Sequence, residues 1–277
     1  MQSDTFVIEG LKIFYSITNP QGVNKIFFIH GNSSSSANWR KQVASLLLAN
    51  YRLVTIDLPN HEGSSALDST DDFSLPGLAK IVSAAVSQLS NGKAYIICSS
   101  SLGTNIVAEM PVGDTEPAGY FLAGPCIIGE GFGMDKMMLQ DMDPSAIFTD
   151  NASKEDVIKY ATETSLSTDL KDLDYFLNDY RAVQDNFRSS LYATIAAGNY
   201  NDQIKLIQLR NCPVCIVFGK EEKIVNIKYL DNAPINLWNK TIYKIPGASH
   251  LVNIDAPQAF NEILAAFSKD RFTTNDA

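Results

Sequence analysis

The chain has 277 residues, of which 45% are apolar and 19% are charged, and its formal net charge is −9. This balance allows a large buried core and excludes an intrinsically disordered chain. Nucleic-acid phosphates bind clusters of Lys and Arg, and the sequence has no such cluster, so the charge argues against a nucleic-acid partner. The length suits one doubly wound α/β domain that carries an insertion.

The sequence pattern predicts neither a secretory signal nor a metal site. Its first residues lack a basic segment followed by an apolar stretch, and no apolar run approaches the roughly 20 residues that span a bilayer. We therefore expect a soluble, cytoplasmic protein with no membrane partner. The four cysteines are Cys98, Cys126, Cys212 and Cys215. Cys212 and Cys215 have the spacing of a metal knuckle, but no second pair completes a site. We predict four buried thiols, no metal and no cofactor, and the oligomeric state is left open.

Short β-branched and aromatic runs alternate with longer helical stretches, the pattern of a mostly parallel sheet covered on both faces. The predicted strands are residues 5–8, 12–18, 25–29, 52–56, 94–98, 119–123, 214–218 and 241–245. The first two are close in sequence, with Glu9-Gly10 between them, which predicts an antiparallel hairpin at the sheet edge. Helices are predicted at residues 39–49, 75–89, 102–110, 227–233 and 257–268.

The alternation breaks after Gly124-Pro125 and resumes only at Val214. Three helices are predicted between them, at residues 154–164, 170–181 and 185–197, with many charged residues that mark a solvated face. These helices could lie on the surface or form a cap over the carboxyl edge of the sheet, where open α/β sheets bind ligands. A long insertion needs a surface to pack against. We therefore predict a helical cap at 126–209 on an α/β core formed by 1–125 and 210–277.

A serine-rich turn follows the predicted strand at 94–98 and precedes a predicted helix. It reads Ser99-Ser100-Ser101-Leu102-Gly103, in the strand, turn and helix context of a nucleophile elbow. The residues two before and two after the nucleophile must be small, which Ser99 and Gly103 satisfy for Ser101. Ser99 stands where glycine is usual, and a chance serine-rich turn is the alternative interpretation. We predict Ser101 as the nucleophile.

His250 is the candidate general base. It ends the segment Pro246-Gly247-Ala248-Ser249-His250, directly after the last predicted strand. The acid should lie between the nucleophile and the histidine, after the penultimate strand. Two adjacent glutamates compete there. Glu222 is favoured because it lies three residues after Gly219, whereas Glu221 is expected to be a solvated neighbour.

Two earlier loops follow predicted strands at the same edge. His30-Gly31-Asn32 comes after residues 25–29, where a backbone amide can face a developing oxyanion. We predict that the amides of Asn32 and Leu102 form an oxyanion hole and that His30 orients its loop. Asp57 and His61 could be mistaken for an acid and a base. Because Asp57 precedes the nucleophile in the chain, we interpret both as loop scaffolding.

Together these motifs resemble the α/β-hydrolase superfamily over essentially the whole chain. The resemblance rests on the order of the His30-Gly31 loop, the Asp57-Leu58-Pro59 loop, the serine elbow, the acid after the penultimate strand and the terminal histidine. It implies an α/β-hydrolase fold with a mostly parallel eight-stranded sheet, helices on both faces and a helical cap. It also implies a carboxylic ester hydrolase with Ser101, His250 and Glu222 as its catalytic triad.

A narrower resemblance is to the N-acyl-homoserine lactone lactonases of the α/β-hydrolase type, the quorum-quenching AidH-like enzymes. It rests on residues 30–35, 156–161, 219–225 and 236–241, and it departs at Ser99 and in much of the cap. It implies an acyl-homoserine lactone whose ring lies at Ser101 and whose acyl tail lies under the cap. Tyr160 matches a position that faces the site in that family, so the resemblance implies that Tyr160 binds the substrate. An ordinary cap-helix aromatic is the alternative.

The sequence thus predicts a serine lactonase that acts through an acyl-enzyme, with a small-molecule ester or lactone as its partner. A carboxylesterase of other small esters, using the same machinery, stays open. So does a non-catalytic small-molecule receptor on the same fold. Epoxide hydrolases and haloalkane dehalogenases share the fold but carry Asp at the elbow, so Ser101 argues against them.

Overall fold

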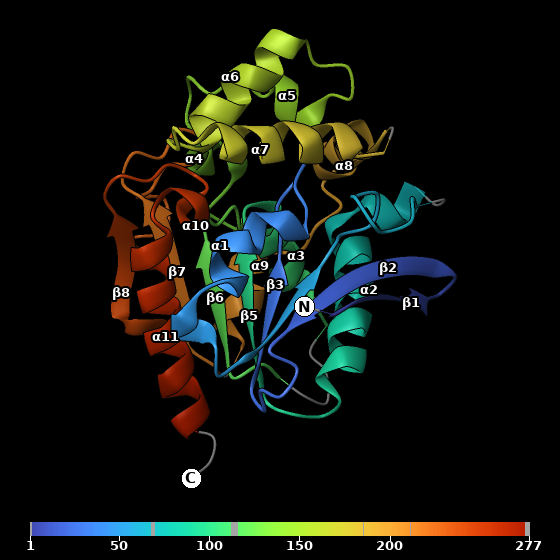
Figure 1. Ribbon diagram of the computed structural model, residues 1–277. Coiled ribbons are helices and arrows are strands. Elements are labelled where there is room, and N and C mark those ends of the chain that lie inside the picture. The colour runs from blue at the N-terminus through green and yellow to red at the C-terminus, as the bar shows by residue number, and fades with distance from the viewer. Residues whose placement is uncertain (1, 68–69, 112–115, 185, 211, 275–277) are drawn as a thin grey trace.

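An eight-stranded sheet forms the centre of the molecule (Figure 1). The structure is a computed structural model that describes residues 2–67, 70–111, 116–184, 186–210 and 212–274. The strands are β1 (Gln2–Ile8), β2 (Leu11–Thr18), β3 (Lys25–Ile29), β4 (Arg52–Ile56), β5 (Tyr95–Ser100), β6 (Gly119–Ala123), β7 (Val214–Gly219) and β8 (Leu237–Ile245). Their order is β1-β2-β4-β3-β5-β6-β7-β8. The β1–β2 and β2–β4 pairs are antiparallel, and the other pairs are parallel.

The central strands are buried on both faces, as their nearly uninterrupted apolar runs predict. Adjacent side chains of β3 point to opposite faces, so Phe27 and Phe28 belong to separate apolar cores. Phe27 shares its core with α2 (Leu75–Ser90) and α3 (Leu102–Glu109). Phe28 shares the other core with α11 (Pro257–Thr274). The predicted doubly covered sheet is confirmed.

Two predicted helices differ from the structure. In place of the helix predicted at 39–49 there are three short helices, η1 (Ser36–Trp39), α1 (Arg40–Val43) and η2 (Leu46–Leu48). A further short helix, η3 (Thr70–Phe73), precedes α2. The predicted helix at 227–233 is wrong. Its amides bond three residues back in successive turns, as from Tyr229 to Asn226 and from Asp231 to Lys228. Asn and Asp favour such turns over helix, and here the Asn226 side chain also accepts from the Lys228 amide.

Six helices of the described residues lie between β6 and β7 in sequence, and the first five form a layer beyond one end of the sheet (Figure 1). These five are α4 (Met134–Met137), α5 (Ser145–Phe148), α6 (Lys154–Thr164), α7 (Leu170–Ala182) and α8 (Phe187–Ala196). A capping box between Ser153 and Asp156 starts α6, which has the predicted bounds. Asp185, where the third cap helix was predicted to begin, lies outside the described residues. We call α4–α8 the cap helices.

The chain leaves the sheet for the cap and returns from it at one place. The Ile128 amide donates to Gln203 Oε1 at 3.0 Å, and the Gln203 amide donates to Ile128 O at 2.9 Å. From there α9 (Gln203–Gln208) packs against α3 in the core layer. Within the part of the chain that the structure describes, no helix is long and apolar enough to cross a membrane.

Candidate active site

Ser101 occupies a strained turn between β5 and α3. Its backbone has φ 50° and ψ −127°, outside the regions that non-glycine residues favour. The Ser101 amide donates to Ala123 O of β6 at 3.1 Å, which fixes the turn to the neighbouring strand. Strain of this kind persists only where the surroundings hold it, and it is concentrated at functional sites.

The residues on either side of this turn have very little space. A Cβ atom on Gly103 would lie 2.6 Å from the carbonyl oxygens of Ile29 and His30, so only glycine fits there. Ser99 is completely buried, and its hydroxyl has no hydrogen-bond partner among the described residues. The turn therefore accepts the Ser99 Cβ but gives its hydroxyl nothing to bind.

The structure brings Ser101, His250 and Glu222 into one hydrogen-bonded line. His250 Nε2 lies 2.9 Å from Ser101 Oγ, and His250 Nδ1 lies 2.9 Å from Glu222 Oε2. The histidine and glutamate side chains are 2% and 0% exposed, so water does not compete for these contacts. Such an arrangement can move a proton from the hydroxyl to the ring while the carboxylate stabilises the resulting imidazolium.

The two candidate glutamates have different partners. Glu222 Oε1 accepts from the amides of Ile224 and Val225, which orients the other oxygen toward His250. Glu221 is exposed, but Oε2 accepts from the amides of Gly247 and Ala248 at 2.9 and 3.2 Å. It therefore supports the chain leading to His250 from outside, a role that its sequence position did not reveal.

The environment of His250 changes its proton affinity. Burial disfavours the charged imidazolium, but the Glu222 carboxylate and the Cys126 thiol together outweigh burial and raise the pKa of His250 to about 10. A general base accepts a proton only when it is neutral. Proton transfer from Ser101 should therefore become more available as the pH rises toward this value.

Asn32 and Leu102 lie beside the Ser101 side chain and line the same cavity. Leu102 is the first residue of α3, so its amide has no acceptor within the helix. The Asn32 loop packs directly on the serine, since a Cβ on Gly31 would lie 2.8 Å from Ser101 Cβ. Both residues thus lie beside Ser101, and an oxyanion hole formed by their two amides stays a prediction.

The cap holds the Asn32 loop in place. Asn32 Nδ2 donates to Ile147 O of α5 at 2.8 Å. Ser33, whose φ is 58°, donates through Oγ to Asn32 Oδ1 and accepts from Arg188 Nε of α8 at 2.8 Å. Arg188 is 4% exposed and also lies over the Tyr180 ring, 3.8 Å from its centroid. A buried cap arginine therefore fixes the residue that follows Asn32.

His30 and His61 bond the main chain of the same loops. His30 Nε2 accepts from the Leu58 amide at 3.0 Å, and His61 Nε2 accepts from the Ser33 amide at 3.2 Å. Burial lowers the pKa of both rings, which favours the neutral form that accepts these bonds. Asp57 likewise accepts from the Ser36 amide. These contacts orient loops, and neither histidine is bonded to Ser101.

A largely apolar cavity begins at Ser101 and runs under the cap. It is lined by Asn32, Leu75, Ser101, Leu102, Asn105, Cys126, Ile128, Met134, Met137, Met138, Ile147, Phe148, Tyr160, Leu191, Ile195, Ile224 and Val225. None of these described lining residues is charged. Tyr160 is 7% exposed and packs edge-on against Phe176, with ring centroids 5.4 Å apart. It therefore lines the cavity that contains Ser101 and is also part of the packing of the cap.

Cys126 is the cysteine that differs from the sequence-based expectation. Cys98, Cys212 and Cys215 are buried free thiols, but Cys126 is only half-buried and lines the cavity. Its Sγ lies 4.0 Å from Ser101 Oγ. Its position after Gly124-Pro125, at the carboxyl end of β6, was the available signal, since open α/β sheets bind ligands at that edge.

The chain belongs to the alpha/beta hydrolase family, whose model matches residues 26–263. This match and the sheet topology confirm the predicted fold. The chain is a hydrolase of the α/β type.

Comparison with individual proteins gives low identity over nearly full length. The chain is 23% identical to the uncharacterized hydrolase YugF of Bacillus subtilis, covering 95% of this chain and 97% of the relative. It is 23% identical to human monoacylglycerol lipase ABHD6, covering 94% and 80%. A crystal structure of an N-acyl homoserine lactonase AidH mutant with N-hexanoyl homoserine lactone superimposes with a TM-score of 0.88 at 22% identity, covering 98% of both chains. At such identity the structural likeness establishes the fold.

Proposed function

We propose that this chain is a serine hydrolase that opens the lactone ring of N-acyl-homoserine lactones through an acyl-enzyme. The observation that carries the serine mechanism is the buried line from Ser101 Oγ to His250 Nε2 and from His250 Nδ1 to Glu222, with 2.9 Å at each contact. Ser101, His250 and Glu222 are the nucleophile, the general base and the acid.

Acylation begins when neutral His250 removes the Ser101 hydroxyl proton and the oxygen attacks the lactone carbonyl carbon. The Asn32 and Leu102 amides hold the oxyanion, a contribution of roughly 3 kcal/mol per donor. His250 then protonates the ring oxygen as the carbon–oxygen bond breaks. Water, activated by the same histidine, releases the N-acyl-homoserine and restores Ser101.

A lactone adds a constraint that a linear ester lacks. The freed hydroxyl stays tethered to the acyl-enzyme, where its effective concentration is on the order of 10⁵ M in a well-oriented system. Ring closure therefore competes with attack by water unless the hydroxyl is turned away. Tyr160 lines the same cavity as Ser101 and is the residue to which we assign this role.

The cavity supports an acylated substrate. Most of its lining is apolar, with three methionines and Phe148 under the cap, and such a surface suits an alkyl chain. The full-length likeness to an AidH structure that contains N-hexanoyl homoserine lactone supports the lactone headgroup.

A carboxylesterase of other small esters is the second candidate. The described residues that line the cavity are uncharged and would accept the acyl chain of a linear ester as well as that of a lactone. Human monoacylglycerol lipase ABHD6 is a relative of comparable identity. The mechanism would be the same, except that the leaving alcohol would diffuse away.

Turnover of N-hexanoyl homoserine lactone and of p-nitrophenyl hexanoate by the wild type and by Ser101→Ala tests both candidates. Ser99→Ala is the matched control, because it removes a neighbouring buried hydroxyl that is not bonded to His250. We expect Ser101→Ala to lose at least about 10³-fold of both activities and Ser99→Ala to keep them.

Each outcome of this test has a distinct meaning. Faster lactone than ester turnover supports the lactonase, and ester turnover alone supports the carboxylesterase. Tight lactone binding without turnover would overturn both in favour of a receptor, and an active Ser101→Ala would overturn the serine mechanism. Because the sequence predicts no metal site, EDTA should leave turnover unchanged.

A further inference from the structure

The residues on both sides of His250 are hydrogen-bonded to the cap. Ser249 Oγ donates to Glu163 O at 2.6 Å, and the Leu251 amide donates to Thr164 O at 2.8 Å. Glu163 and Thr164 are the last two residues of α6. The position of the His250 backbone is therefore tied to the carboxyl end of a cap helix.

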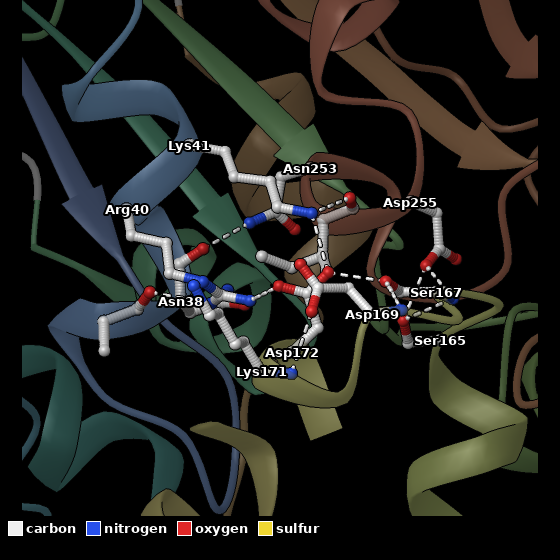
Figure 2. Close-up of polar contacts among 12 residues, drawn as sticks. Asn38, Arg40, Lys41, Ser165, Ser167, Asp169, Lys171, Asp172, Asn253 and Asp255 are labelled. Carbon is white, nitrogen blue, oxygen red and sulfur yellow. Dashed lines mark hydrogen bonds and ion pairs between the residues drawn. The ribbon is translucent and has the colours of Figure 1, made fainter. Parts of the chain in front are cut away.

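Asp255 adds a second connection between the same two parts of the molecule. It lies at the end of α10 (Val252–Asp255), and its Oδ2 accepts from the Ser249 amide at 2.8 Å. Its Oδ1 accepts from Ser165 Oγ at 2.6 Å and from the Leu166 and Ser167 amides at 2.9 and 3.1 Å. Figure 2 shows the Asp255 carboxylate directed toward Ser165 and Ser167. One carboxylate thus serves both the residue before His250 and the turn after α6.

A neighbouring carboxylate fixes this turn to the core. Asp172 of α7 accepts from Lys41 Nζ at 2.7 Å and from Ser167 Oγ at 2.5 Å, and it also pairs with Arg40 (Figure 2). Burial opposes its ionisation, but the hydrogen bonds from Lys41, Ser167 and Arg40 lower the pKa of Asp172 to about 2. Lys41 Nζ also donates to Ile254 O, beside Asp255. The turn that binds Asp255 is therefore itself held in place.

We propose that Asp255 is a positioning residue for His250. By joining the Ser249 amide to the cap turn at 165–167, it sets the backbone from which the imidazole reaches Ser101 on one side and Glu222 on the other. The proposal rests on the proposed serine mechanism. It gives the cap a part in catalysis beyond enclosing the acyl chain, because displacement of the cap turn would move the general base.

The geometry leaves little tolerance for such a displacement. The imidazole makes two contacts of 2.9 Å in opposite directions, so a backbone shift that lengthens one of them disturbs proton transfer. A misplacement of about 1 Å can lower a rate about 100-fold. Asp255 itself contacts none of the reacting atoms, and its effect should therefore appear in kcat and not in KM.

Asp255→Asn is the variant that separates these effects. An amide has nearly the same size, but only one of its two ends can accept, so its NH₂ group must face either the Ser249 amide or the three cap donors. We expect kcat for p-nitrophenyl hexanoate to fall about 10- to 100-fold with KM changed less than about twofold. The rate at which a fluorophosphonate inactivates Ser101 should fall in parallel.

The pH profile distinguishes positioning from a merely structural role. Displacing the ring from Glu222 weakens the interaction that raises the pKa of His250. The acid limb of kcat/KM in Asp255→Asn should therefore move to lower pH. A residue that only stabilised the fold would lower the melting temperature and leave the profile and kcat unchanged at temperatures where the variant is folded.

Two further variants complete the test. Ser249→Ala removes the bond to Glu163 O and leaves Asp255 in place, so it should cause a smaller loss of kcat of the same kind, and it decides the matter if Asp255→Asn does not fold. Asp231→Asn is the matched control, because Asp231 is exposed and its pair with Lys244 contributes little. Unchanged kcat and pH profile in the folded variants would overturn the proposal. An active Ser101→Ala would instead overturn the serine mechanism on which it rests.

Discussion

The four groups of the candidate site are held in two different ways. Ser101 is fixed by the hydrogen bond from its amide to β6 and by close packing at the elbow. Glu222 is fixed by hydrogen bonds from amides of its own loop. His250 and Asn32 instead depend on bonds to the cap, at Glu163 and Thr164 for the former and at Ile147 for the latter. The proposed nucleophile and acid are therefore built into the core, whereas the proposed base and one proposed oxyanion donor are set partly by the insertion.

After loss of the Ser101 hydroxyl, the largest effect on the core-held pair is expected from Glu222→Gln. An amide in place of the carboxylate no longer stabilises the imidazolium and can hold the ring in the wrong tautomer, so kcat should fall on the order of 10³- to 10⁴-fold. Loss of the negative charge also lowers the pKa of His250, which Glu222 raises. The residual activity should therefore keep its plateau to lower pH than the wild type. Steady-state ester hydrolysis across a pH series measures both the fall in kcat and the shift of its pH dependence.

Glu221→Gln is the control for this change. Its carboxylate bonds only the amides of Gly247 and Ala248 and does not touch the ring. It should reduce kcat no more than about tenfold and leave the acid limb where it is. Equal losses in the two variants would contradict the assignment of Glu222 as the acid.

Arg188→Met tests the cap-held oxyanion loop. The change removes the donor to Ser33 and keeps a long apolar side chain against Tyr180. Removing an oxyanion donor outright costs about 10²- to 10³-fold, so loosening the loop that carries Asn32 should lower kcat about 10- to 100-fold with little change in KM. The exposed Arg181→Met is the matched control. Affinity for a trifluoromethyl ketone, which mimics the tetrahedral intermediate, should fall together with kcat, and unchanged affinity would refute a role in the oxyanion hole.

Tyr160→Phe asks whether the cap also acts on the leaving group. If the hydroxyl turns the freed alcohol away from the acyl-enzyme, its loss should lower the ratio of lactone to ester turnover by about tenfold, the equivalent of one hydrogen bond of ~1.4 kcal/mol. The two substrates should share the same acyl chain. Equal losses of lactone and ester turnover would show that the Tyr160 hydroxyl has no such role and that the residue only packs against Phe176.

Ser99→Ala should have the smallest effect, and it lies wholly within the core. Removing a buried hydroxyl that has no partner among the described residues should raise the free energy of unfolding by about 1 kcal/mol, with activity unchanged. Urea unfolding at equilibrium measures the difference. A loss of stability would show that the hydroxyl supports the elbow.

Most of the core could be predicted from sequence because its signals are local. The runs at 26–29 and 214–218 are apolar throughout and lie in fully buried strands, and the Ser153 capping box marks the start of α6. The prediction of a helix at 227–233 failed because the Asn226 side chain stabilises a turn there, which an apolar pattern does not reveal. Chain order gave the candidates Ser101, Glu222 and His250, since each follows a recognisable strand.

The contacts between the cap and the site could not be predicted in the same way. Asp255 joins Ser249 to residues 165–167, which are far away in sequence. Neither segment has a sequence pattern that predicts contact with the other. Arg188 reads as an ordinary charged residue of a cap helix until the fold places it against Ser33. Such pairings depend on how two separately folded layers meet, which local propensity does not determine.

The reciprocal bonds between Ile128 and Gln203 have a consequence for how this protein can diverge. An insertion whose two ends meet can change in length and composition without displacing the strands on either side of it. Residues 129–202 therefore form a natural unit of exchange, and a transplanted segment would bring its own acyl-chain walls. The new protein would be active only if the segment also supplied hydrogen-bond acceptors for Ser249 and Leu251. Exchange of this segment between relatives should therefore change the shape of the acyl-chain cavity more often than it preserves activity.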